Sequence, residues 1–339
     1  MLISPAIIAL TAASLMVAGF TLYASGVGLR ILVQWDASSA GESQLRLERK
    51  TYLVSAILGH MLVIELVSLF LFIAVANQLH VFFTGAMCAA GVLNAGPFGY
   101  ATLALKTASF VACGVWLVVN HVDARGRDYP LIRFKYAFLL GICLLLVAET
   151  VVQTRFLLGL VPPIITSCCG TLFNERVRQV ATGMAHLPAV TAAEIFYAGM
   201  LLTLAVGVYC GLTGRYDGLY GLLSVAVFPL SIGALISYFC LYLYEMPTHH
   251  CPFCMLQGEY RYVGYFLYLF LLVGAIAGAG AGILGRFRQK ISLADLIPPI
   301  QKKLCGVSVL GYGLFTLRVT YPVVFSDFKL TATSQRRAT

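Results

Sequence analysis

The sequence predicts an all-α, polytopic integral membrane bundle of about eight transmembrane helices. Of the 339 residues, 60% are hydrophobic and only 11% are charged, whereas soluble domains have roughly 45–50% apolar and about 25% charged residues. Long apolar stretches also follow one another along the chain. Each is near the roughly 20 residues that a helix needs to cross a hydrocarbon core about 30 Å thick. We therefore expect a lipid bilayer to be the main solvent of this chain.

We expect transmembrane helices near residues 6–34, 51–79, 98–120, 133–158, 190–212, 218–245, 261–284 and 304–325. The first stretch is interpreted as a retained helix because residues 1–19 contain no basic side chain and because the apolar run is much longer than a signal-peptide core of roughly 7–15 residues. The predicted organisation is one transmembrane domain over residues 1–325, followed by a polar tail over residues 326–339.

Basic side chains concentrate in alternate predicted loops, and Lys and Arg accumulate on the cytoplasmic side of membranes. The loops expected in the cytoplasm contain Arg30, Arg46, Arg49, Lys50, Arg125, Arg127, Arg133, Lys135, Arg215, Arg286, Arg288, Lys290, Lys302 and Lys303. Both termini and the loops 80–97, 159–189 and 246–260 then lie on the outer, periplasmic side of a bacterial cytoplasmic membrane. The net charge of +9 is explained by this topology, so we expect no nucleic-acid partner.

The ten cysteines fall into two groups. Those within or at the ends of predicted helices are expected only to pack, as small hydrophobic side chains: Cys113, Cys143, Cys210, Cys240 and Cys305. The others lie in the predicted outer loops, on the oxidising side of such a membrane: Cys88, the adjacent pair Cys168 and Cys169, and the pair Cys251 and Cys254. We expect the three loops to converge, because a cluster can exchange electrons only if its sulfur atoms come within bonding range.

The segment His249-His250-Cys251-Pro252-Phe253-Cys254 precedes the helix expected to begin near Arg261. A C-x-x-C that opens a helix places its first sulfur near unpaired N–H groups, which favours the thiolate. Cys251 is therefore the expected nucleophile and Cys254 the resolving thiol. The tetrapeptide Cys-Pro-Phe-Cys resembles the active-site motif of thioredoxins and glutaredoxins. The combination of a C-x-x-C at the outer end of a membrane helix with further cysteines in outer loops also resembles quinone-linked membrane thiol oxidases and vitamin K epoxide reductases. This resemblance implies electron relay to a quinone.

Metal binding is the competing interpretation of the same residues. His249 and His250 directly before Cys251 and Cys254 would supply ligands for a soft metal ion, such as copper, zinc or a heavy metal. A further alternative is a structural subunit of a larger membrane complex.

Four ionisable side chains lie within predicted helices: His60, Glu65, Lys106 and Glu149. Each would be costly if it faced lipid, so we expect all four to face the bundle interior or one another, as candidates for cofactor binding. An internal ion pair between Glu65 and Lys106 is the purely structural alternative.

The predicted function is membrane-embedded thiol/disulfide exchange, an oxidoreductase activity that passes electrons between a periplasmic thiol protein and quinone. The sequence contains no P-loop and no C-x-x-C-H motif, which argues against nucleotide-driven transport by this chain alone and against c-type haem attachment.

Overall fold

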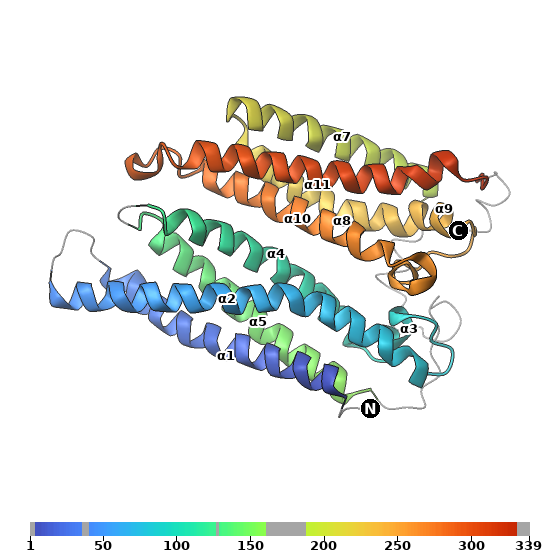
Figure 1. Cartoon of the computed structure of the whole chain (residues 1–339), viewed down its shortest axis with the longest axis horizontal. Helices are drawn as coiled ribbons and strands as arrows, with labels where there is room; N and C mark the ends of the chain where they lie inside the picture. Colours follow the sequence, from blue (N-terminus) through green and yellow to red (C-terminus); the bar gives the residue numbers. More distant parts are fainter. Residues whose placement is uncertain (1–3, 36–40, 127–128, 161–187, 331–339) are drawn as a thin grey trace. The chain divides into compact units, whose positions relative to one another are not determined.

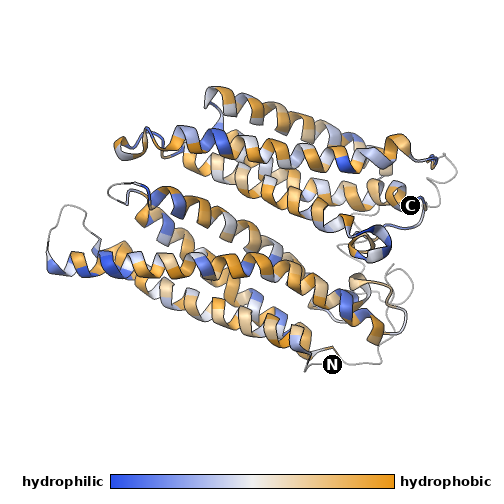
Figure 2. Cartoon of the chain, in the orientation of Figure 1, coloured by the Kyte–Doolittle hydropathy of each residue, from blue (hydrophilic) through white to orange (hydrophobic). Residues whose placement is uncertain are grey.

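A computed structural model describes residues 4–35, 41–126, 129–160 and 188–330 of the chain. Within these residues the regular structure is entirely helical (Figure 1). In this described part of the chain, eight helices are long and apolar enough to cross a membrane: Pro5–Gln34, Glu42–Phe82, Gly99–Asp123, Ile132–Leu158, Ala189–Thr213, Asp217–Tyr244, Val263–Gly285 and Ile297–Phe325. The predicted all-α membrane bundle is therefore confirmed. Apolar residues cover most of the length of these helices (Figure 2).

Two helix starts lie well before their predicted positions. Helix α2 (Glu42–Leu79) begins with polar turns in which Glu42 and Arg46 form an exposed ion pair, so hydropathy marked only its apolar part. Helix α11 (Ile297–Phe325) carries Pro298 and Pro299 in its first turn, where proline needs no backbone N–H partner. Both helices thus extend out of their apolar stretches through sequence that is compatible with a helix but not with lipid.

The chain contacts divide these elements into two compact units. Unit 1 consists of residues 1–75, 98–161 and 287–300, and unit 2 consists of residues 76–97, 162–286 and 301–339. The single transmembrane domain expected over residues 1–325 stays a prediction.

Unit 1 contains α1 (Pro5–Gln34), most of α2, α4 (Gly99–Asp123) and α5 (Ile132–Leu158). Helix α5 packs against both α1 and α4. Trp116 and Tyr136 are completely buried between these helices, and their polar atoms are satisfied: the Trp116 indole donates to the carbonyl of Lys135 at 3.1 Å, and the Tyr136 hydroxyl lies 3.0 Å from Ser55 Oγ. These hydrogen bonds allow large rings with a polar atom to be buried in the core.

A buried ion pair joins the facing ends of α4 and α5. Lys135 Nζ lies 2.7 Å from Asp123 Oδ2, and the other oxygen of Asp123 accepts from the N–H of Leu131 at 2.8 Å. Lys135 was counted among the basic loop residues of the predicted cytoplasmic side; it lies instead in the first turn of α5, whereas its side of the membrane stays a prediction. The residue is 1% exposed inside α5, because pairing with Asp123 compensates the cost of burying its charge.

Unit 2 contains α3 (Ala89–Asn94), α7 (Ala189–Thr213), α8 (Asp217–Ala234), α9 (Cys240–Tyr244), α10 (Val263–Gly285) and most of α11. Helix α8 packs against both α7 and α10. A stripe of glycines on α10 allows close approach: a Cβ on Gly278 would collide with Ser224 of α8, and one on Gly282 would lie 2.7 Å from the Cα of Gly221. Small residues spaced by four are the usual means of close helix packing in lipid.

A π-helical turn, Leu235–Phe239, joins α8 to α9 within one continuous span. Such turns displace backbone carbonyls from the regular α-helical ladder and often occur near functional sites. Here the carbonyl of Ile236 lies 2.9 Å from His250 Nδ1 and must accept from it, since a carbonyl cannot donate. The turn thereby holds the segment that carries Cys251 and Cys254.

Candidate functional site

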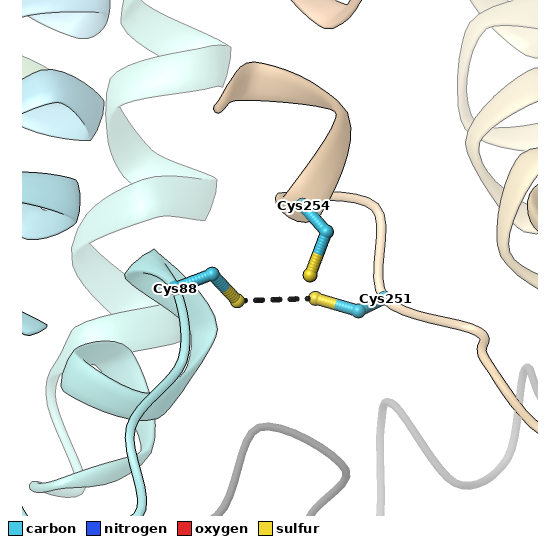
Figure 3. A group of neighbouring side chains, drawn as sticks. All are labelled: Cys88, Cys251 and Cys254. Carbon is cyan, nitrogen blue, oxygen red and sulfur yellow. Dashed lines mark hydrogen bonds between the residues drawn. The ribbon is translucent and has the colours of Figure 1, made fainter. Parts of the chain in front are cut away.

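Three cysteines gather in unit 2. The sulfur atoms of Cys88, Cys251 and Cys254 lie within 4.8 Å of one another, and Cys88 and Cys251 are 3.4 Å apart (Figure 3). All three side chains are at most 5% exposed. We call these three residues the thiol cluster. A separation of 3.4 Å is a contact between thiols and exceeds the roughly 2.05 Å of a disulfide bond.

Short elements between the long helices place these sulfurs. Cys88 has an extended backbone and directly precedes α3, whereas Cys251 lies in the loop after α9. Cys254 begins the 3₁₀ turn Cys254–Leu256, whose residues are all buried. Because the loop after α2 and the loop after α9 belong to the same unit, residues far apart in sequence meet in one cluster.

Hydrogen bonds from three side chains hold the loop around Cys251. The Tyr244 hydroxyl donates to the carbonyl of Cys251 at 2.8 Å, and the Tyr268 hydroxyl donates to that of Pro252 at 2.7 Å. Gln257 Nε2 donates to the carbonyl of Met87 at 2.6 Å, which ties the two cysteine-bearing loops together. The two tyrosine bonds satisfy carbonyls of an irregular segment that is at least partly buried, as a stable structure requires.

The sequence had suggested that the C-x-x-C opens the transmembrane helix, and this is wrong. Helix α10 begins only at Val263, and Cys251 lies in the loop between α9 and α10, before the 3₁₀ turn that Cys254 begins. The predicted lowering of the Cys251 pKa is also wrong. Its hydrogen bond with Cys254 is the largest influence and, together with burial, raises the pKa of Cys251 to about 12, although the hydrogen bond with Cys88 acts in the opposite direction. The site therefore favours neutral sulfur species over an isolated thiolate at Cys251.

The two histidines proposed as metal ligands lie outside the set of converging sulfurs. His250 is held on the carbonyl of Ile236 by its Nδ1, and the His249 ring packs against Tyr244 with 4.3 Å between ring centroids. Burial, followed by the proximity of His250, lowers the pKa of His249. The sulfur of Cys88 occupies the place beside Cys251 and Cys254 that the sequence analysis had assigned to imidazole.

The predicted convergence of the loops at Cys88 and at Cys251 and Cys254 is confirmed. The adjacent pair Cys168 and Cys169, which was expected to join them, lies outside the described residues. The predicted roles of Cys251 as nucleophile and Cys254 as resolving thiol remain predictions.

Three cysteines assigned only to packing have sulfur or polar partners. Cys240 Sγ is 3.8 Å from the carbonyl of Cys251, so this fourth thiol borders the thiol cluster. Cys210 and Cys305 bring their sulfurs to 3.5 Å, beside Asp217. In the sequence, the position of Cys240 near the end of the predicted span 218–245 was the one indication that it lies close to the loop of Cys251. The meeting of Cys210 with Cys305 depends on how α7 and α11 face each other.

The ionisable side chains within the helices meet in unit 1, with one exception. Lys106 Nζ lies 2.7 Å from Glu149 Oε1 and 3.4 Å from Glu65 Oε1, so the expected pair is part of a three-residue cluster. His60 was expected to face the interior, and this prediction is wrong. It is exposed, and its Nδ1 bonds to the carbonyl of Ala56 one turn earlier at 2.8 Å, which partly satisfies the ring.

Searches against family models, curated proteins and solved structures find no match to this chain.

Proposed function

We propose that this chain is a membrane-embedded thiol/disulfide oxidoreductase of a bacterial cytoplasmic membrane, which passes electrons between a periplasmic thiol protein and quinone. The observation that carries the proposal is the approach of the Cys88, Cys251 and Cys254 sulfurs to within 4.8 Å of one another. Sulfur atoms at this separation can form either of two disulfides after a small movement of the loops.

The proposed chemistry has two balanced stages. A thiolate of the partner attacks one sulfur of an oxidised cluster, and the displaced cysteine takes up a proton. The second partner thiol then resolves the mixed disulfide, so that the partner leaves as a disulfide and the cluster holds two thiols. Quinone next accepts two electrons and two protons from these thiols, which restores the cluster disulfide and produces quinol.

Cys251 is the central sulfur in this scheme because it has interactions with both of the other thiols. A Cys88 thiolate that attacks Cys251 in a Cys251–Cys254 disulfide forms a Cys88–Cys251 disulfide and releases Cys254 as the leaving thiolate. This exchange moves the oxidised pair without net oxidation. It lets one cysteine pair face the partner while another faces the quinone.

The alternative is a soft-metal site, which the same three sulfurs favour. A tetrahedral zinc ion with Zn–S bonds of about 2.3 Å would hold its sulfur ligands about 3.8 Å apart, close to the spacing of the thiol cluster. A tetrahedral metal site needs four ligands, however, and the converging set among the described residues has three. A disulfide needs only two of these sulfurs and leaves the third as the exchanging thiol, so we prefer the redox function.

Differential alkylation of the purified protein, with and without reductant and combined with metal analysis, tests the proposal. We expect reversible oxidation of the thiol cluster without stoichiometric metal. When the reduced protein attacks the disulfide form of the partner, which is the reverse of the first stage, Cys251→Ser should form no mixed disulfide. The double variant Cys88→Ser/Cys254→Ser should accumulate it, because both cluster thiols that can resolve it are then missing. Cys143→Ser, which changes a buried cysteine of unit 1, is the matched control. Stoichiometric metal that protects the three thiols from alkylation would replace the proposal with the alternative.

A further inference from the structure

Unit 1 contains a cluster of charged side chains that the thiol chemistry does not use. It consists of Glu65 on α2, Lys106 on α4 and Glu149 on α5, which are each at most 2% exposed. Lys106 is the eighth residue of α4, so it lies about 10 Å along that helix at 1.5 Å per residue. Glu149 lies nine residues before the end of α5, or about 13 Å by the same measure. The cluster is therefore within the membrane-spanning part of the bundle.

The ammonium group of Lys106 uses all its hydrogen-bonding capacity within the cluster. It donates to Glu149 Oε1 at 2.7 Å, to Ser68 Oγ at 2.9 Å and to Glu65 Oε1 at 3.4 Å. Ser68 in turn donates its hydroxyl proton to Glu65 Oε1 at 2.7 Å. Three donors is the maximum for a lysine, so Lys106 is a fully satisfied cation held between two carboxyl groups.

The charges of the cluster do not balance if both carboxyl groups are ionised. Two carboxylates and one ammonium leave a net charge of −1, and an uncompensated charge inside a membrane protein is strongly unfavourable. Among the described residues, Cys113 on α4 also interacts electrostatically with all three side chains, and it offers no positive charge. From α1, the neighbouring polar contact is Ser14 with Gln153, at 3.1 Å, and both side chains are neutral.

The two carboxyl groups lie close to each other. Glu65 Oε1 and Glu149 Oε1 are 3.4 Å and 2.7 Å from the same ammonium nitrogen, and an ionised carboxylate disfavours ionisation of a second one nearby. A proton on one of the two groups removes this repulsion. Glu149 Oε2 is moreover buried without a hydrogen-bond donor among the described residues, so this oxygen is available to carry the proton.

The remaining buried acid of the described residues provides a contrast. Asp123 pairs with Lys135 alone, at 2.7 Å, so one carboxylate faces one ammonium and that pair is neutral without an added proton. The 2:1 ratio of acid to base at Lys106 is what distinguishes the cluster.

We propose that Glu65 and Glu149 share one proton beside Lys106, and that unit 1 thereby contains a proton-binding site inside the membrane. The site can release and regain this proton while Lys106 continues to hold both carboxyl groups. Buried carboxyl groups of this kind are the usual carriers of protons in membrane pumps and transporters. The thiol cluster belongs to unit 2, so this proposal does not depend on the proposed redox function.

Infrared spectroscopy of the purified full-length protein in H₂O and D₂O tests the site. At neutral pH we expect a C=O band of one protonated carboxyl group that shifts on deuteration. Glu65→Gln and Glu149→Gln should each abolish the band, because the remaining carboxylate is then balanced by Lys106. Lys106→Gln should increase it up to two-fold, because neither carboxyl group then has a cation. Glu259→Gln, which changes an exposed acid, is the control and should leave the band unchanged.

The wild-type spectrum is informative even if a variant does not fold. Absence of a protonated-carboxyl band from folded wild-type protein at neutral pH would overturn the proposal, because the cluster would then hold both carboxylates ionised. Retention of the full band in both folded glutamine variants would also overturn it by placing the proton elsewhere.

Discussion

The two disulfides available to the thiol cluster should stabilise the protein to very different extents. In Cys254→Ser only Cys88 and Cys251 of the cluster can pair, and their sulfurs must approach by about 1.4 Å from the observed 3.4 Å to reach bonding distance. In Cys88→Ser only the C-x-x-C pair can form. The first disulfide crosslinks residues 163 positions apart, whereas the second closes a loop of four residues.

Chain entropy converts this difference into free energy. Closure of a loop of 163 residues removes entropy worth about 5 kcal/mol from the unfolded state, and closure of a loop of four residues removes about 2 kcal/mol. If the helices of a membrane protein persist in the unfolded state, that state has less entropy, so a crosslink removes less of it. We therefore expect the oxidised form of Cys254→Ser to gain up to about 3 kcal/mol more stability over its reduced form than Cys88→Ser gains.

Denaturant titrations of the oxidised and reduced forms, followed by circular dichroism, measure these two gains. Peptide mapping identifies the linked cysteines, and non-reducing gel electrophoresis should show faster migration only for Cys254→Ser, because only the long crosslink compacts the denatured chain. Failure of Cys88 and Cys251 to link under oxidation, or equal gains in the two variants, would refute the reasoning that these sulfurs form an exchangeable pair.

Three further predictions concern reactivity, topology and packing. Because the pKa of Cys251 is raised to about 12, its thiol is protonated at neutral pH. Alkylation of Cys251, followed by mass spectrometry, should therefore become faster as the pH rises, and an alkylation rate independent of pH between 7 and about 10 would contradict this. A cysteine introduced at Arg125 should be labelled by an impermeant reagent only from the cytoplasm, and one at His249 only from outside; labelling of both from one side would exclude the predicted orientation. Gly278→Ala should destabilise the protein by about 1–3 kcal/mol through overpacking. Gly306→Ala is the control and should not destabilise it, because an added Cβ there meets nothing within 4 Å. Equal thermal stability of the two variants would refute the close packing of α10.

The number and approximate positions of the transmembrane helices follow from the sequence alone. A spanning helix satisfies its own backbone hydrogen bonds and needs about 20 apolar residues, so its presence is a local property of the chain. Alternation of the spans likewise places the loops at Cys88 and Cys251 on one side, which made their convergence predictable. Only the exact starts of α2 and α11 were missed, because polar residues and prolines extend these helices beyond their apolar parts.

Tertiary structure decided which side chains meet. A helix that is apolar on every side gives little information about the direction in which a particular residue points, and that direction depends on packing against the other helices. Lys106 therefore turned out to lie between two carboxyl groups, whereas His60 faces outward. The same reason explains why Cys88, and neither histidine, lies beside Cys251. The raised pKa of Cys251 results from its contact with Cys254 and from burial, which exist only once the loop between α9 and α10 has folded.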